Sequence, residues 1–198
     1  SQKHYELVLK SNPEYEMAFN AKINLARSLE KGNPDSKKMK EKLLKMTKDD
    51  KNKEYLDQIY YTIAEMEINN GDTALAIENY SLSAINSIQN NPQKSLSFLA
   101  LGKIYFKKSM YKSANTNYDS TIVYMDEDFR LYKETYERYL VLKDLVSNIN
   151  IVEMQDSLQV LSKLPKSDQN AIISGIIKEV IEKERQAAEE QRLKQQMQ

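Results

Sequence analysis

Two stretches of sequence decide the fold: YYTIAEMEINNGDTALAIENY at residues 60–80 and FLALGKIYFKKSMYKSANTNY at residues 98–118. In both, aromatic and aliphatic residues recur three and four positions apart, which marks one face of a helix. In both, the run is interrupted at the same place, by Gly71-Asp72 in the first copy and by Ser109-Met110 in the second. The pattern therefore predicts a pair of helices joined by a tight turn, used twice.

Small residues at matching positions predict that the two helices of each pair approach closely. These residues are Ala64 and Ala76 in the first copy, and Gly102 and Ala114 in the second. The second copy starts 38 residues after the first (98 minus 60). The pattern resembles the tetratricopeptide repeat, a helix pair of about 34 residues that stacks into a solenoid. Two positions depart from that pattern: Glu67, where an aromatic residue is usual, and Ser109, where glycine is usual.

The whole composition favours an all-α fold. The chain has 198 residues with only four glycines and four prolines, and the prolines lie between the expected helices. We predict a tetratricopeptide-repeat helical solenoid with extra C-terminal helices. Its expected parts are N-terminal helices of a truncated or degenerate repeat (1–53), two clear repeats (54–126), a C-terminal helical cap (127–181) and a polar helical extension (182–198). Within the cap, helices are expected at 128–147, 151–163 and from 168 onward, with a turn at 148–150 and an apolar stripe from Ile172 to Ile181 that seals the repeats.

Charge and composition exclude several kinds of partner. The chain carries 29 basic and 29 acidic residues, so it lacks the basic excess of a general nucleic-acid-binding surface. No run of about 18 apolar residues occurs, so the sequence predicts no membrane span in this fragment. There is no cysteine, so thiolate chemistry is excluded.

Catalytic and metal-binding patterns are also missing from the sequence. His4 is the only histidine, and no Gly-rich phosphate loop or HExxH motif occurs. The acidic run Asp126-Glu127-Asp128 reads as the start of a helix rather than a metal site, because the oxygen-rich loop of a calcium site is absent. We therefore expect no enzyme, no catalytic residue, no cofactor and no metal.

A repeat solenoid is a binding surface, and the first helix of each pair in this family lines the concave face. The candidate groove residues lie on this helix beside the row of residues that packs inside the helix pair. They are Gln58, Tyr61, Glu65 and Ile68 in the first repeat, Leu96, Leu99, Lys103 and Phe106 in the second, and Asn20, Asn24 and Arg27 at a more polar end. Tyr61, Leu99 and Phe106 are large for solvent-facing positions, which favours a protein partner. The alternative is that a neighbouring helix of the same chain covers them.

Several segments outside the repeat consensus resemble one family more closely. They are FNAKINLARS (19–28), KKMKEKLLKMTKDDKNKEYLDQIYYTIAEM (37–66), QKSLSFLALGKIYF (93–106), YDSTI (118–122) and DSLQVLSKLPKSDQNAIISGIIKEV (156–180). Together they are similar to the tetratricopeptide-repeat lipoprotein of the type IX secretion and gliding-motility machinery of Bacteroidetes (the PorW/SprE type), of which this chain would be an internal fragment.

This resemblance implies a function. The full protein would be lipid-anchored, in the periplasm and associated with the outer membrane, and it would connect other type IX secretion components rather than catalyse a reaction. A second hypothesis stays open: the sensory tetratricopeptide-repeat module of a cytoplasmic regulator, with 167–198 as its signalling helix. A kinase or DNA-binding domain encoded downstream would favour the sensor, and an upstream lipoprotein signal would favour the adaptor.

Overall fold

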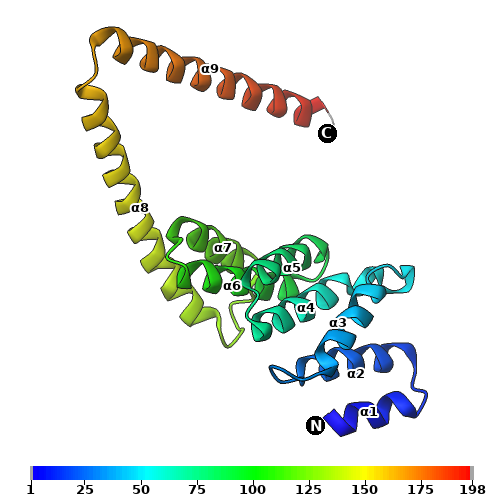
Figure 1. Cartoon of the computed structure of the whole chain (residues 1–198). Helices are drawn as coiled ribbons and strands as arrows, with labels where there is room; N and C mark the ends of the chain where they lie inside the picture. Colours follow the sequence, from blue (N-terminus) through cyan, green and yellow to red (C-terminus); the bar gives the residue numbers. More distant parts are fainter. Residues whose placement is uncertain (1, 197–198) are drawn as a thin grey trace. The chain divides into compact units, whose positions relative to one another are not determined.

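The computed structural model describes residues 2–196, and its regular structure is helical throughout (Figure 1). The α-helices are α1 (Gln2–Lys10), α2 (Tyr15–Arg27), α3 (Asp35–Met46), α4 (Leu56–Asn70), α5 (Thr73–Asn86), α6 (Asn91–Lys107), α7 (Tyr111–Tyr124), α8 (Tyr132–Ser162) and α9 (Lys166–Gln196). A 3-10 helix, Asp50–Tyr55, leads into α4. No strand occurs in the described part, which confirms the predicted all-α class.

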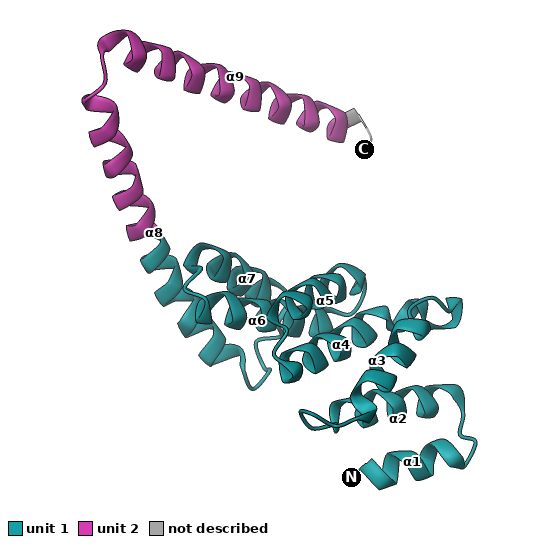
Figure 2. Ribbon diagram, in the orientation of Figure 1, with its two compact units in different colours: residues 1–146 teal, residues 147–198 magenta. Residues whose placement is uncertain are grey.

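The chain divides into two compact units, residues 1–146 and 147–198 (Figure 2). We call them the N-terminal unit and the C-terminal unit and describe each by itself. The N-terminal unit contains α1 to α7 and the first half of α8. The C-terminal unit contains the rest of α8 and α9, which are joined by a three-residue turn at 163–165.

Both copies of the sequence pattern form the helix pairs expected of them. α4 packs along α5, α6 packs along α7, and α5 also packs on α6. Each first helix ends in the same way. Gly71 adopts φ 90°, and the Asp72 amide donates to the Glu67 carbonyl at 2.9 Å. Ser109 adopts φ 56°, and the Met110 amide donates to the Tyr105 carbonyl at 2.9 Å.

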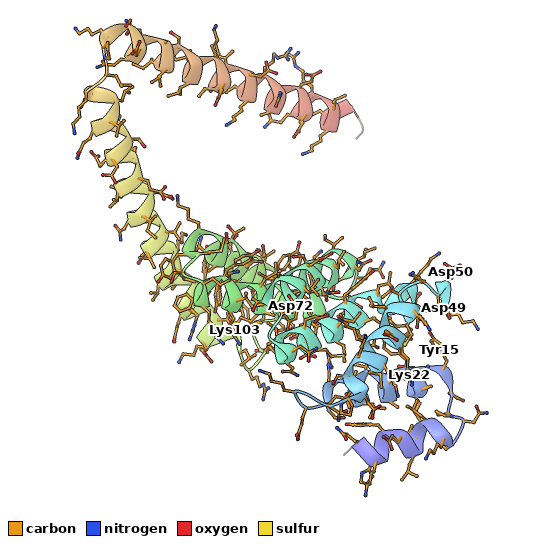
Figure 3. The ribbon with its side chains drawn as sticks, in the orientation of Figure 1. Tyr15, Lys22, Asp49, Asp50, Asp72 and Lys103 are labelled. Carbon is orange, nitrogen blue, oxygen red and sulfur yellow. The ribbon has the colours of Figure 1, made fainter. Side chains whose placement is uncertain are left out.

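A residue with positive φ, followed by a hydrogen bond from an amide to the carbonyl five residues earlier, is the Schellman motif, which ends a helix and turns the chain. Asp72, which Figure 3 labels, caps the start of α5: its carboxylate accepts a hydrogen bond from the Leu75 amide at 3.0 Å. The equivalent residue in the second pair, Met110, has no capping side chain. Ser109 therefore adopts the left-handed backbone that glycine adopts in the first copy, with the steric cost that a Cβ brings to a positive φ.

The small residues lie where the helices meet. Ala64, Ala76 and Ala114 are completely buried. A Cβ atom added to Gly102 would lie 2.9 Å from Cδ2 of Tyr118, whose ring is itself buried. α6 and α7 can therefore approach to this distance only because residue 102 has no side chain.

The N-terminal helices pack on α4 rather than forming a separate core. Phe19, Ile23 and Leu43 from α2 and α3 share one apolar cluster with Ile59 and Ile63 of α4. At the edge of this cluster, Lys40 donates to the buried Glu67 carboxylate at 2.8 Å. Glu67 departs from the repeat pattern, and this ion pair with α3 is the structural reason it is accommodated.

A buried polar network joins α4, α5 and α6. The Asp57 carboxylate accepts from Asn90 Nδ2 at 2.9 Å and from Ser87 Oγ at 3.2 Å. Ser83 Oγ lies 2.7 Å both from the Asp57 carbonyl oxygen and from Ser97 Oγ. Burial raises the pKa of Asp57, and the hydrogen bonds to its carboxylate oppose that rise. The network orients the second helix pair on the first.

The predicted turn at 148–150 is wrong, because α8 runs unbroken from Tyr132 to Ser162. This segment, Asn148-Ile149-Asn150, contains neither glycine nor proline. Its residues therefore lower helix stability only slightly, and the helix continues through them.

α9 likewise continues to Gln196, so the expected extension is helical over 182–196, and residues 197–198 lie outside the described part. The stripe from Ile172 to Ile181 is exposed, and its sealing of the repeats stays a prediction.

Candidate functional site

The predicted groove residues Arg27, Tyr61 and Glu65 lie together where α2 faces α4. Arg27 Nε donates to Glu65 Oε2 at 2.8 Å, and the Arg27 guanidinium carbon lies 5.5 Å from the centre of the Tyr61 ring. The Tyr61 ring meets the Tyr80 ring edge-on, with centroids 5.1 Å apart. An ion pair and two aromatic rings from α2, α4 and α5 thus form one continuous contact.

Burial governs the charges of this cluster. It raises the pKa of Tyr61 to about 12, with the nearby Glu65 carboxylate adding to the rise and Arg27 opposing it. Burial also raises the pKa of Tyr80 and of Glu65, and the Arg27 guanidinium opposes both shifts. Both phenols are therefore uncharged at neutral pH and present apolar ring faces.

Two adjoining hollows open beside this cluster. The first has a volume of about 280 Å³ and is lined by Arg27, Glu65, Met66, Ile68, Asn69 and Tyr80. The second has a volume of about 380 Å³ and is lined by Ile68, Thr73, Tyr80, Ala100, Lys103, Ile104, Lys107 and Lys108. Because both contain Ile68 and Tyr80, we treat them as one surface and call it the α4–α6 groove.

The α4–α6 groove has an apolar centre and charged ends. Ile68 and Tyr80 lie at the centre, the Arg27–Glu65 pair lies at one end, and Lys103 lies at the other (Figure 3 labels Lys103). Of the predicted site residues, Arg27, Glu65, Ile68 and Lys103 line it directly. Tyr61 does not line it, but it is half-buried and its ring contacts that of Tyr80, which does.

The remaining predicted residues lie elsewhere. Leu96 lines a separate hollow of about 370 Å³ with Pro92, Met125 and Phe129. Phe106 is 38% exposed, and it packs on the Tyr111 ring at 5.8 Å and under the Arg138 guanidinium at 5.8 Å. Asn20 is exposed on α2, and Asn24 and Gln58 are half-buried.

The prediction that Leu99 faces a groove is wrong. Leu99 is only 4% exposed and lies in the apolar cluster of Ala114, Tyr118, Met125 and Leu142. The reason is α8, whose Leu142 packs on this part of the second helix pair. For Leu99, the alternative that a neighbouring helix covers the position is therefore the correct one.

Several residues that line the groove were not among the predicted site residues, Tyr80, Lys107 and Lys108 among them. Tyr80 is buried, yet it lines both hollows of the groove. Lys107 and Lys108 were not singled out, although Lys103 and Lys107 are four residues apart and share a helix face. That spacing was the available signal.

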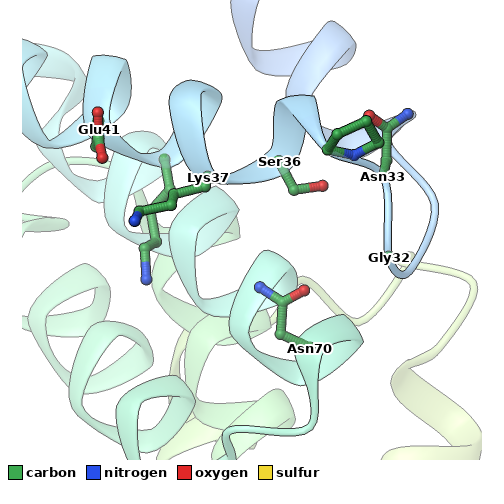
Figure 4. A pocket seen from close by; sticks show the side chains of 8 residues that line it. Gly32, Asn33, Ser36, Lys37, Glu41 and Asn70 are labelled. Atoms are coloured by element: carbon green, nitrogen blue, oxygen red, sulfur yellow. The ribbon is translucent and has the colours of Figure 1, made fainter.

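A fourth hollow lies between the start of α3 and the end of α4 (Figure 4). Its volume is about 410 Å³, and the side chains that line it are polar, with Asn33, Ser36, Lys37, Glu41 and Asn70 among them.

Within residues 2–196, no cluster of three or more histidine, aspartate or glutamate side chains is placed to hold a metal ion. No helix of the described part combines the length and apolarity needed to cross a membrane.

Neither a protein-family model nor a curated protein matches this chain at a significant level.

Proposed function

We propose that this chain is a non-catalytic adaptor that binds a protein partner along the α4–α6 groove. The observation that carries the proposal is the groove itself, an open surface with Ile68 and Tyr80 at its centre, the Arg27–Glu65 ion pair at one end and lysines at the other. Protein interfaces combine an apolar centre with a polar rim in this way. The ion pair and the two aromatic rings beside this surface link α2, α4 and α5 to one another.

The finer fold assignment belongs to the same proposal. The two helix pairs at a spacing of 38 residues (98 minus 60), closed by matching turns at Gly71 and Ser109, support a tetratricopeptide-repeat solenoid. In such a solenoid α4 and α6 are the first helices of consecutive repeats, which line the concave face. The groove lies between these two helices.

The biological setting follows from the resemblance of the segments quoted above to the type IX secretion and gliding-motility lipoprotein. We propose that the partners are other components of that machinery, that the work is protein export and gliding motility, and that the full protein is held at the outer membrane, facing the periplasm, by a lipid anchor. The sensory module of a cytoplasmic regulator is the competing proposal. The unbroken course of α9 is the observation that favours it, since a signalling helix must be continuous.

A cross-linking pull-down from a Bacteroidetes envelope extract tests the adaptor. The native chain is compared with an Ile68→Glu/Lys103→Glu variant, which places two acidic groups in the groove at exposed positions. Ile88→Glu is the matched control, because Ile88 is 83% exposed and lies outside the groove. We expect secretion components to be captured by the native chain and the control and lost with the groove variant.

Two other outcomes would change the proposal. Equal capture by the groove variant would keep an adaptor and move its binding surface away from Ile68 and Lys103. Capture of no envelope component by any of the three chains would contradict the adaptor.

A further inference from the structure

α9 carries an apolar stripe that nothing in its own unit covers. Its members are Ile172, Ile173, Ile176, Ile177, Val180 and Ile181, with exposed fractions from 43% to 59%. The stripe lies on a single unbroken helix (Figure 2). Six branched side chains on one face, this far exposed, are typical of a helix whose partner is another helix.

The spacing of the stripe specifies the kind of helix that fits it. Ile172, Ile176 and Val180 form one row at intervals of four residues, and Ile173, Ile177 and Ile181 form a second row beside it. Rows at intervals of four form ridges on a helix surface, and the ridges of one helix can pack into the grooves of another. Both helices of such a contact must have these rows. The α9 helix of a second copy of this chain has them, because its sequence is the same.

The stripe is also symmetric about its own midpoint, which lies between Ile176 and Ile177. When one α9 is laid against another in the opposite direction around this point, Ile176 faces Ile177. In the same register Ile172 faces Ile181, and Ile173 faces Val180. Each row of one helix therefore meets the other row of its partner, and no apolar residue of the stripe faces a polar one. A two-fold contact requires a surface that is complementary to itself in this way.

The charged residues that follow the stripe select the antiparallel direction. In the register just described, Glu184 faces Gln169 and Lys183 faces Asn170. In a parallel pair Glu184 would face Glu184 of the other helix, close to the line of the stripe, and like charges at such a contact repel. α9 contains four lysines and two arginines against one aspartate and five glutamates, so two copies carry no net repulsion.

We propose that two copies of this chain associate through α9, in an antiparallel contact centred on Ile176 and Ile177. This interface is separate from the α4–α6 groove and does not depend on the proposed function. An adaptor built this way would present two grooves to its partners.

Sedimentation equilibrium of the full chain over a range of concentrations tests the proposal. The chain has a mass of 23.0 kDa, and we expect a reversible monomer–dimer equilibrium. Ile176→Lys and Ile177→Glu should each weaken the dimer at least about tenfold, since each places two charged groups opposite isoleucine. Ile88→Lys, at an exposed isoleucine outside the stripe, is the matched control and should leave the equilibrium unchanged. Far-UV circular dichroism checks that all variants keep their helix content.

A mixture of the two charged variants tests the register. In a mixed antiparallel pair, Lys at 176 of one copy faces Glu at 177 of the other, and the second contact keeps its two isoleucines. We therefore expect the mixture to dimerise more strongly than either variant alone. A native chain that stays monomeric at every concentration, or charged variants that dimerise like the native chain, would overturn the interface. A mixture that stays as weak as its components would overturn the antiparallel register.

Discussion

Gly102 sets the distance between α6 and α7. The ring of Tyr118 lies against its backbone, so close that a methyl group at residue 102 would come within 3.0 Å of Cε2 as well as 2.9 Å of Cδ2. The tyrosine ring cannot retreat easily, because it is buried among Leu99, Ala114 and Leu142. The sequence pattern predicts only that residue 102 is small, whereas the packing of Tyr118 against it requires glycine.

Gly102→Ala should lower the free energy of unfolding by about 1–3 kcal/mol, the usual cost of overpacking a core. The loss is expected even though alanine is the better helix former by about 1 kcal/mol. Gly175→Ala is the matched control, because a Cβ there meets no atom within 4 Å, so it should not destabilise the chain. Urea denaturation measures both. A Gly102→Ala chain as stable as the native one would show that α6 and α7 can move apart without cost.

At the scale of elements, α4 is the helix on which the N-terminal unit is assembled. One side carries Ile59 and Ile63, which pack with α2 and α3. Another carries Ala64, which meets α5 and α6 through Ala76 and Leu101. The ring of Tyr61, also on α4, contacts both Arg27 of α2 and Tyr80 of α5. The ionisation of Tyr61 therefore reports on whether α2, α4 and α5 remain together.

The stability of the chain should fall between pH 10 and pH 12 in a way that depends on Tyr61. An unfolded tyrosine loses its proton near the ordinary pKa of 10.0, whereas the folded chain holds that proton until about 12. A raised folded pKa gives stability that is complete below pH 10 and is lost as the pH rises through this window. The loss amounts to at most about 3 kcal/mol.

Urea denaturation at several alkaline pH values should therefore show a smaller decline for Tyr61→Phe than for the native chain. Phenylalanine keeps the ring contact with Tyr80 and removes the titrating group. Identical declines in the two chains would contradict the assignment of the effect to Tyr61.

At the scale of the whole molecule, burial is confined to the N-terminal unit. Among the described residues, the last buried one is Leu142, and the C-terminal unit has only partly buried or exposed side chains. The apolar positions of α8 beyond residue 146, such as Ile151, Met154 and Leu158, are exposed by half or more. We therefore expect the N-terminal unit to fold without the C-terminal unit.

A chain ending at Val146 should fold by itself, with a thermal midpoint within about 4 °C of that of the full chain, a difference of about 1 kcal/mol. Both chains are best compared at low concentration, because association through α9 would raise the apparent stability of the full chain. The readout is the loss of far-UV circular dichroism on heating. A shortened chain that is unfolded, or that melts far earlier, would show that residues 147–198 stabilise the core directly.

Much of the fold could be predicted because its signals are local. The helix periods, the breaks at Gly71-Asp72 and Ser109-Met110, and the small residues at Ala64 and Ala114 follow from the backbone preferences and side-chain sizes of neighbouring residues. The candidate groove was predictable only in part. The spacing of residues along a helix correctly predicts the face on which Glu65, Ile68 and Lys103 lie. It does not show which of these faces another helix covers.

The sequence by itself determined that the chain is helical, where its first helix pairs turn, and that α9 carries one apolar face. The tertiary structure alone decided that Leu99 is buried, that Tyr80 forms part of the groove floor, and that Glu67 is paired with Lys40. The physical reason is distance along the chain. Helix formation depends on residues three and four apart, whereas burial depends on contacts such as Leu99 with Leu142, which only the packed helices bring together.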